Sequence, residues 1–296
     1  MGRPAAPLVA FLSLLVPLGL AGSCAVGPSH ESLALDGIEE FSLAIDALQG
    51  TRLAAWAAGG EDARRVILVH GTPGSAAGWR RYLVDPIPGL RTIAFDRPGF
   101  GRTKPSSARV AFEDQAAALV PLLEPDAEGR WPILVGHSLG GPIVARAAAD
   151  HPDRVGGIVI LSGSLDPALE KPRWFNHAAD LILFRMLLSS SWRHSNEEIL
   201  SAPLHTRELA PVLGRVRCPV VIVHGTEDSL VPYANVAYMR KAFTNAASLE
   251  VVTLEGADHF IPWTHERVVR NAVARLARTP GELRTGILGR AGATNR

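Results

Sequence analysis

A serine between two glycines stands where an apolar run gives way to a helical pattern. The run at 132–135 is followed by Gly136, then Ser138, then Gly140. This G-x-S-x-G spacing is typical of a sharp strand-to-helix turn that holds the serine at positive φ and exposes its hydroxyl above a sheet. Side chains at the two glycines would collide across so tight a turn. The next helix would direct its N-terminal N–H groups at the site, so Ser138 is a candidate nucleophile beside donors that favour negative charge.

The sequence also offers a base for this serine and an acid to orient the base, both of which a hydroxyl nucleophile needs. Asp228 lies just beyond the apolar run at 219–223, and His259 lies just beyond the run at 249–254. Because the carboxyl ends of parallel strands meet at one edge of a sheet, we expect both residues at the rim that carries Ser138. The chain order of serine, acid and histidine predicts covalent catalysis.

Eight short apolar runs must position these residues. They lie at 41–45, 52–57, 66–69, 91–95, 132–135, 157–161, 219–223 and 249–254, with helices expected at 108–123, 139–149, 233–243 and 265–277. The first two runs alternate apolar and polar residues, which predicts an antiparallel edge pair. The later runs are unbroken, as in parallel strands buried on both faces. The alternation predicts an α/β fold, with an open, mostly parallel sheet and helices on both faces.

The gap between 161 and 219 is too long for a single crossover. It holds the apolar residues Trp174, Phe175, Leu181, Ile182, Leu183, Phe184, Met186, Leu187, Leu188 and Trp192. We expect a helical cap over the active site, inserted at about 164–214, because long insertions at this edge are usually functional. Additional core packing is the alternative.

The N-terminus is interpreted as a targeting segment. Arg3 precedes an apolar run at 8–20 that is too short to span a bilayer, and small residues lead to Cys24. Residues 1–23 therefore predict a signal peptide. Because 20–24 resembles the lipobox of bacterial lipoproteins, we expect Cys24 to be lipidated and to anchor the protein to a membrane of the bacterial cell envelope. A secreted or soluble periplasmic protein is the alternative, and a core helix is a third.

The remaining parts of the chain follow from this division. Residues 24–40 would form a tether, 41–280 the folded domain and 281–296 a loosely ordered tail. The 296 residues include 30 Lys and Arg and 29 Asp and Glu, a formal net charge of +1. That balance suggests neither nucleic acid nor an anionic membrane surface as a partner. The candidate catalytic residues make a small-molecule substrate the expected partner. We expect Cys218 to be a small buried residue.

Further motifs carry a family resemblance. They are His70-Gly71-Thr72-Pro73-Gly74, Asp96-Arg97-Pro98-Gly99-Phe100-Gly101, Gly225-Thr226-Glu227-Asp228 and Gly256-Ala257-Asp258-His259. With the serine turn, they make the chain resemble the α/β-hydrolase superfamily over roughly residues 40–280. The resemblance implies an α/β-hydrolase fold with a mostly parallel eight-stranded sheet and no cofactor. It implies Asp228 as the acid, His259 as the base, and the backbone N–H groups of Thr72 and Leu139 as the oxyanion hole.

Other ionisable residues compete for these roles. Asp166 is the alternative acid, because some members of the superfamily place the acid after the strand expected at 157–161. Glu227 and Asp258 adjoin the proposed acid and base, but consecutive side chains rarely point the same way, so both are interpreted as loop residues. Three histidines, His70, His137 and His224, are expected to brace the loops and the turn. Five further histidines, His151, His177, His194, His205 and His265, lack metal-ligand spacing, so no metal is expected.

The resemblance favours an ester hydrolase. Related haloalkane dehalogenases and epoxide hydrolases carry aspartate at the position of Ser138, and proline iminopeptidases differ at Thr72 and Leu139. We therefore expect cleavage of a carboxylic ester through an acyl-enzyme, with a fairly apolar substrate because the cap is apolar. Carbon–carbon bond hydrolases and cofactor-free perhydrolases share the triad and remain alternatives. A non-catalytic ligand-binding homologue is the alternative from another class.

Overall fold

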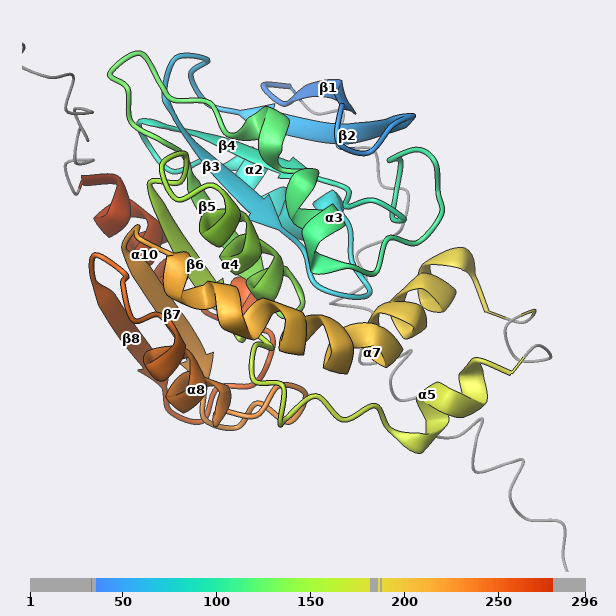
Figure 1. Ribbon diagram of the computed structural model, residues 1–296. Coiled ribbons are helices and arrows are strands. Elements are labelled where there is room, and N and C mark those ends of the chain that lie inside the picture. Colours follow the sequence, from blue (N-terminus) through green and yellow to red (C-terminus); the bar gives the residue numbers. More distant parts are fainter. Residues whose placement is uncertain (1–32, 34–35, 182–185, 187, 279–296) are drawn as a thin grey trace, which may run out of the picture.

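The computed structural model describes residues 33, 36–181, 186 and 188–278 (Figure 1). The expected signal at 1–23, Cys24, most of the expected tether and the tail at 281–296 lie outside the described residues.

An eight-stranded sheet forms the centre of the molecule (Figure 1). Its strands are β1 (Glu39–Ile45), β2 (Thr51–Ala58), β3 (Arg64–Val69), β4 (Leu90–Phe95), β5 (Ile133–His137), β6 (Gly157–Leu161), β7 (Val220–Gly225) and β8 (Leu249–Leu254). Their spatial order is β1-β2-β4-β3-β5-β6-β7-β8. β1 pairs antiparallel with β2, β2 pairs antiparallel with β4, and all other neighbours are parallel. All eight predicted strands and the antiparallel edge pair are confirmed.

Helices cover both faces of this sheet. They are α2 (Arg80–Val84), α3 (Phe112–Ala117), α4 (Gly140–Asp150), α5 (Trp174–Ala179), α7 (Ser190–Leu209), α8 (Asn235–Ala242), α9 (Ile261–Thr264) and α10 (Glu266–Arg278). Two apolar cores result, because successive strand residues point to opposite faces. Ile67 packs into the core under α4 and α8, whereas Leu68 packs into the core under α2 and α10. Cys218 is buried in the first core, as predicted, and burial raises the pKa of its thiol to about 12.

One predicted helix is wrong. The range 108–123 does not form a single helix, because α3 ends at Ala117 and a separate 3₁₀ turn covers Val120–Leu122. Pro121 lies in the first positions of that turn. Proline has no backbone N–H to donate to an α-helical ladder, and its ring clashes with the preceding turn, so α3 cannot continue through it.

The long insertion after β6 contains α5, α7 and a 3₁₀ turn at Ala210–Arg215. In Figure 1, α5 and the first half of α7 extend beyond the sheet, beside the carboxyl ends of the strands. Trp174 and Met186 are 66% and 77% exposed, so this part of the insertion does not serve as core. Leu209, at the end of α7, is fully buried in the core beside α4. Core packing therefore describes the second half of the insertion, and the role of the first half as a cap stays a prediction.

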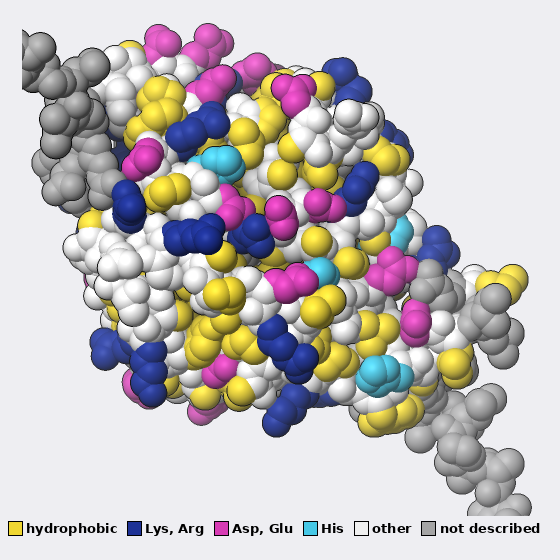
Figure 2. All heavy atoms as spheres, viewed as in Figure 1, with side chains coloured by type: hydrophobic (Ala, Val, Ile, Leu, Met, Phe, Trp, Pro, Cys, Tyr) yellow, Lys and Arg dark blue, Asp and Glu magenta, His cyan; other side chains and the backbone are white. Residues whose placement is uncertain are grey.

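The surface shows no segregation of charge on the face drawn in Figure 2, where basic and acidic side chains are interspersed. In the part of the chain that the structure describes, no helix is both long enough and apolar enough to cross a membrane.

Candidate active site

The strand β5 ends in the predicted sharp turn. Ser138 follows it with φ at 54°, a conformation that non-glycine residues rarely adopt, and α4 begins at Gly140. A Cβ at Gly136 would lie 2.2 Å from the carbonyl oxygen of Gly140, so this glycine is required for the predicted reason. A Cβ at Gly140 would instead lie 2.4 Å from the carbonyl oxygen of Val69 in β3. The second glycine thus permits close approach of a neighbouring strand.

The loops after β7 and β8 bring together the predicted acid and base. Nδ1 of His259 lies 2.8 Å from Oδ2 of Asp228, and both residues are buried. The other carboxylate oxygen, Oδ1, accepts hydrogen bonds from the backbone N–H groups of Leu230 at 3.0 Å and Val231 at 2.8 Å. The carboxylate is therefore fixed in one orientation. Because its oxygen accepts the Nδ1 proton, neutral His259 keeps its lone pair on Nε2, where a base needs it.

The environment of Asp228 favours the charged carboxylate. Burial alone would raise its pKa, but the hydrogen bond and charge of His259 and the N–H of Val231 together hold the pKa below its ordinary value. The carboxylate is thus negative at neutral pH and can stabilise a positive imidazolium that forms on His259.

A second histidine links the loop of the base to the serine turn. His137, which immediately precedes Ser138, donates from Nε2 to the carbonyl oxygen of His259 at 3.0 Å, and the two rings lie 4.8 Å apart. Burial, followed by the charge of His259, lowers the pKa of His137 to about 3. This ring stays neutral near pH 7, and it holds the base loop against the residue next to the candidate nucleophile.

Two further histidines brace loops, as predicted. His70 donates from Nδ1 to the carbonyl oxygen of Gly71 at 2.8 Å, and its Nε2 accepts the backbone N–H of Arg97 at 3.0 Å. His224 donates from Nε2 to the carbonyl oxygen of Val231 at 2.9 Å, in the loop that carries the acid. Burial lowers the pKa of both rings, so each remains a neutral structural donor.

The predicted oxyanion loop lies against the nucleophile. A Cβ at Gly71 would come within 2.8 Å of the Cβ of Ser138 and 3.4 Å of its Oγ. The peptide group between Gly71 and Thr72 is therefore adjacent to the serine, and glycine permits this approach. Leu139, the other predicted donor, stands at the N-terminus of α4 directly after the serine. The oxyanion role of both N–H groups stays a prediction.

The competing acids make other contacts. Asp166 accepts the backbone N–H of Ala168 at 2.9 Å, and its charge contributes to raising the pKa of Tyr238 in α8, behind the effect of burial. Glu227 and Asp258 are exposed, and Asp258 accepts the N–H of Phe260 at 2.9 Å. Asp228 is the acid that contacts the candidate base.

Sequence reasoning missed a buried ion pair behind the predicted oxyanion loop. Arg97 lies within the motif at 96–101, so its position was visible in the sequence, although its role was not. Its partner is Glu198 in α7, and Nη1 of Arg97 lies 2.6 Å from Oε1 of Glu198. Nothing in the pattern around Glu198 distinguishes it from an exposed helical glutamate, so no signal could have found it.

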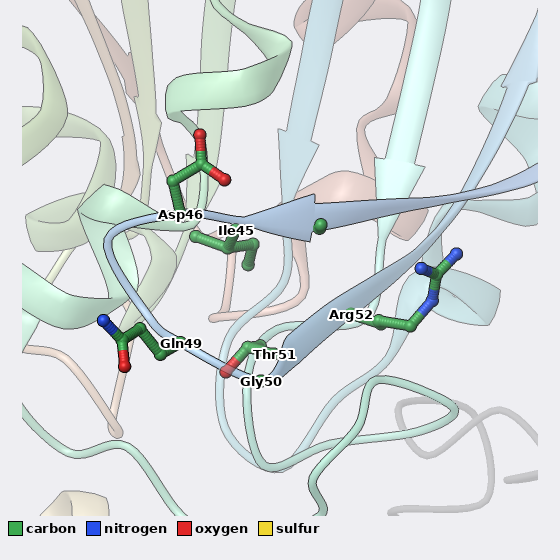
Figure 3. Close-up of a pocket in the computed structure, with 7 residues that line it drawn as sticks. Ile45, Asp46, Gln49, Gly50, Thr51 and Arg52 are labelled. Carbon is green, nitrogen blue, oxygen red and sulfur yellow. The ribbon is translucent and has the colours of Figure 1, made fainter.

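A separate hollow lies at the hairpin between β1 and β2 (Figure 3). Asp46 and Arg52, the charged residues of its lining, point away from one another, so they do not converge on a common ligand. The hairpin lies at the opposite edge of the sheet from β8, and no predicted site residue is there. Among the described residues, no group of three or more His, Cys, Asp or Glu side chains is placed to hold a metal ion.

Known proteins resemble the chain over most of its length. A family model described as alpha/beta hydrolase fold matches residues 64–189, and one described as TAP-like protein matches residues 200–286. The chain is 28% identical over 253 residues to the non-heme chloroperoxidase of Streptomyces lividans, covering 71% of this chain and 90% of that one. It is 25% identical over 246 residues to 2-hydroxy-6-oxononadienedioate/2-hydroxy-6-oxononatrienedioate hydrolase 2 of Pseudomonas putida, covering 70% and 85%. The structure of Cfl2 from Burkholderia cenocepacia matches with a TM-score of 0.66 at 20% identity, covering 84% and 99%.

Proposed function

Because this chain belongs to the α/β-hydrolase superfamily and has its fold, we propose that it is a serine hydrolase that cleaves carboxylic esters of fairly apolar small molecules. The observation that carries the proposal is the buried contact of 2.8 Å between His259 and Asp228, on loops that flank the positive-φ Ser138. A charged acid, an oriented imidazole and a serine hydroxyl are the three groups that acyl transfer requires.

The proposed reaction has two halves. In the first, Nε2 of His259 takes the proton from Ser138 as Oγ attacks the ester carbonyl carbon, and the N–H groups of Thr72 and Leu139 hold the oxyanion. The imidazolium then gives this proton to the leaving alcohol, and an acyl-enzyme remains. In the second half, His259 activates water, which attacks the acyl carbon and releases the acid with Ser138 regenerated.

The apolar character of the substrate is argued from the insertion. Its first half, beside the carboxyl ends of the strands, displays the exposed side chains Trp174, Leu181, Met186 and Trp192. Apolar surface at the entrance to a site favours an uncharged acyl or alcohol group over a charged one.

A second candidate is perhydrolysis, which the resemblance to a non-heme chloroperoxidase favours. In that reaction hydrogen peroxide replaces water in the second half, so that the acyl-enzyme yields a peracid. Carbon–carbon bond hydrolysis is a third candidate, favoured by the resemblance to the Pseudomonas putida hydrolase. A non-catalytic binding protein stays the alternative from another class.

A fluorophosphonate probe tests the serine chemistry. The native protein is expected to be labelled, and Ser138→Ala is expected to remain unlabelled. Absence of labelling in folded native protein would overturn the enzymatic proposal and leave the binding protein.

A panel of p-nitrophenyl esters of increasing acyl length then tests the substrate class. We expect kcat/KM to rise with acyl length, by up to about 15-fold per pair of methylenes, because each fully buried CH₂ contributes about 0.8 kcal/mol. Indifference to acyl length would remove the argument for an apolar substrate. Peracid formation from the same acids with hydrogen peroxide, faster than ester hydrolysis, would select the perhydrolase instead.

The proposed location is the bacterial cell envelope, through a lipid on Cys24 at the end of the expected signal peptide. This segment lies outside the described residues. Cys24→Ala should move the protein from the membrane fraction to the soluble fraction of the producing cells, and unchanged partitioning would contradict the anchor.

A further inference from the structure

The carbonyl group of Gly71 is held from behind by two donors. His70 donates to its oxygen from Nδ1 at 2.8 Å, and Arg97 donates from Nη2 at 3.0 Å. The N–H at the other end of the same peptide group belongs to Thr72. Because the Gly71–Thr72 peptide is trans and planar, its N–H points opposite to its carbonyl oxygen. Fixing the carbonyl therefore fixes the direction of the N–H that is proposed to hold the oxyanion.

Arg97 is itself held by a carboxylate. Its Nη1 lies 2.6 Å from Oε1 of Glu198 and its Nη2 lies 3.0 Å from Oε2, which is the bidentate geometry of a guanidinium–carboxylate pair. The two side chains are 0% and 2% exposed. Gln115 adds a donor to the same carboxylate at 3.3 Å. The guanidinium is thus fixed on one side by Glu198, and Nη2 reaches Gly71 on the other.

The insertion supplies this carboxylate. Glu198 lies on α7, and one helical turn earlier His194 contacts the carbonyl oxygen of Gly99 through Nδ1 at 2.7 Å. The ring of Phe100 covers the guanidinium of Arg97 at 4.7 Å. One face of α7 is therefore docked on the loop after β4, and through Arg97 it reaches the peptide beside the nucleophile.

We propose that Arg97 and Glu198 are positioning residues that set the direction of the Thr72 N–H toward the oxyanion, so that helix α7 controls the strength of the oxyanion hole. The inference rests on the proposed function, because it assigns a role within that reaction. Two effects contribute. The fork of hydrogen bonds prevents rotation of the peptide plane, and a charged donor on the carbonyl polarises the peptide so that its N–H donates more strongly.

The test removes the ion pair without leaving a buried charge alone. In Arg97→Met/Glu198→Leu, apolar side chains of similar length replace both partners, a change that folded proteins commonly tolerate. His70 still holds the carbonyl, so the donor is weakened rather than lost. Removing a whole oxyanion donor costs about 100-fold to 1,000-fold in kcat, so we expect a fall of about 10-fold to 100-fold here. KM for p-nitrophenyl esters should change by less than about threefold, because ground-state binding does not use the oxyanion.

A matched control is Arg64→Met. Arg64 is also buried and also donates to backbone carbonyls, those of Trp131, Leu276 and Ala277, but it lies at the start of β3, at the other end of the sheet from the site. The variant Arg64→Met should lower the midpoint of thermal unfolding while leaving kcat per active site unchanged. Active sites are counted by fluorophosphonate titration in every variant.

A trifluoromethyl ketone separates positioning from loss of structure, because it forms an oxyanion on the serine. Its inhibition constant should rise in the double variant by the same factor by which kcat/KM falls, and should stay unchanged in Arg64→Met. Equal kcat per titrated site in the native protein and the double variant, or an unchanged inhibition constant, would overturn the proposal. If the double variant does not fold, Arg97→Lys gives the same two readouts, since lysine keeps the charge but lacks the planar fork. Failure of the native protein to label would reject the hydrolase function itself, a result distinct from either outcome.

Discussion

The orientation of His259 depends on one carboxylate oxygen. Oδ2 of Asp228 accepts the Nδ1 proton at 2.8 Å, and the opposite oxygen is already occupied by two backbone N–H groups. An amide in place of the carboxylate can keep this geometry only if its NH₂ group faces His259, because the backbone N–H groups require an acceptor. That NH₂ would meet Nδ1 as a donor, so the imidazole would carry its proton on Nε2, where it cannot act as a base.

Asp228→Asn should therefore reduce kcat by about 10,000-fold with little change in KM, as expected when a serine triad holds the wrong tautomer. Ester hydrolysis per titrated site measures the effect. Asp166→Asn is the matched control, because that carboxylate accepts the N–H of Ala168 and not His259. A larger loss in Asp166→Asn than in Asp228→Asn would transfer the role of the acid to Asp166.

The sequence predicted these residues because each one follows a recognisable strand. Ser138, Asp228 and His259 stand shortly after the apolar runs that form β5, β7 and β8, and the topology of a parallel sheet brings such positions to one edge. The reason for Gly140 was only partly visible, because the atom that excludes a side chain there belongs to Val69, 71 residues earlier in the chain. Glu198 was invisible for the same physical cause: its partner comes from a distant element, and local pattern does not encode such contacts.

At the scale of elements, the turn between β5 and α4 leaves no space at Gly136. A Cβ there would meet the backbone oxygen of Gly140 at 2.2 Å, and every residue of β5 is buried, so the backbone cannot easily move away. Gly136→Ala should lower the free energy of unfolding by about 3 kcal/mol, which is at the upper end for overpacking. Urea unfolding gives the value.

Gly60→Ala provides the comparison for this change. The nearest atom to a Cβ at Gly60 is the side chain of Ala63 at 3.8 Å, an ordinary contact, and its φ is not positive. Gly60→Ala should change the free energy of unfolding by about 0.5 kcal/mol or less, the usual range for surface substitutions. Equal stabilities of the two variants would show that the turn is more compliant than its geometry indicates.

Elements differed in how well the sequence predicted them. The strands emerged because unbroken apolar runs bounded by turn residues have few alternatives in a buried sheet. The helix predicted at 108–123 failed at Pro121, a residue whose effect on a helix is local and was readable. The insertion combines exposed apolar side chains, such as Trp174 and Met186, with buried ones, such as Leu209, because its apolar residues do not all face one neighbour. Composition counts apolar residues but does not assign them to the core or to the surface.

At the scale of the whole molecule, three buried histidines make stability depend on pH. Burial lowers the pKa of His70, His137 and His224, in the case of His137 to about 3. Each ring donates to a backbone carbonyl in its neutral form. In the unfolded chain their pKa returns to about 6.5, so below that pH the unfolded state binds more protons than the folded state.

Stability should therefore be fully present above about pH 6.5 and should fall as the pH drops toward the lowered folded values. Each histidine contributes a slope of up to about 1.4 kcal/mol per pH unit. His137, whose folded pKa is about 3, should contribute nearly this full slope between pH 6 and 5, and His70 and His224 act in the same direction. Asp228 acts in a different pH window: its pKa is below its ordinary value, so its contribution to stability is lost only at more acidic pH.

Urea unfolding at pH 7.5, 6 and 5 measures the slope. His137→Gln, whose Nε2 can still donate to the carbonyl of His259, should reduce the slope by about 1 kcal/mol per unit. If the native protein were equally stable at pH 7.5 and pH 5, these rings would have to accept protons inside the fold, and the neutral bracing of the loops would be wrong.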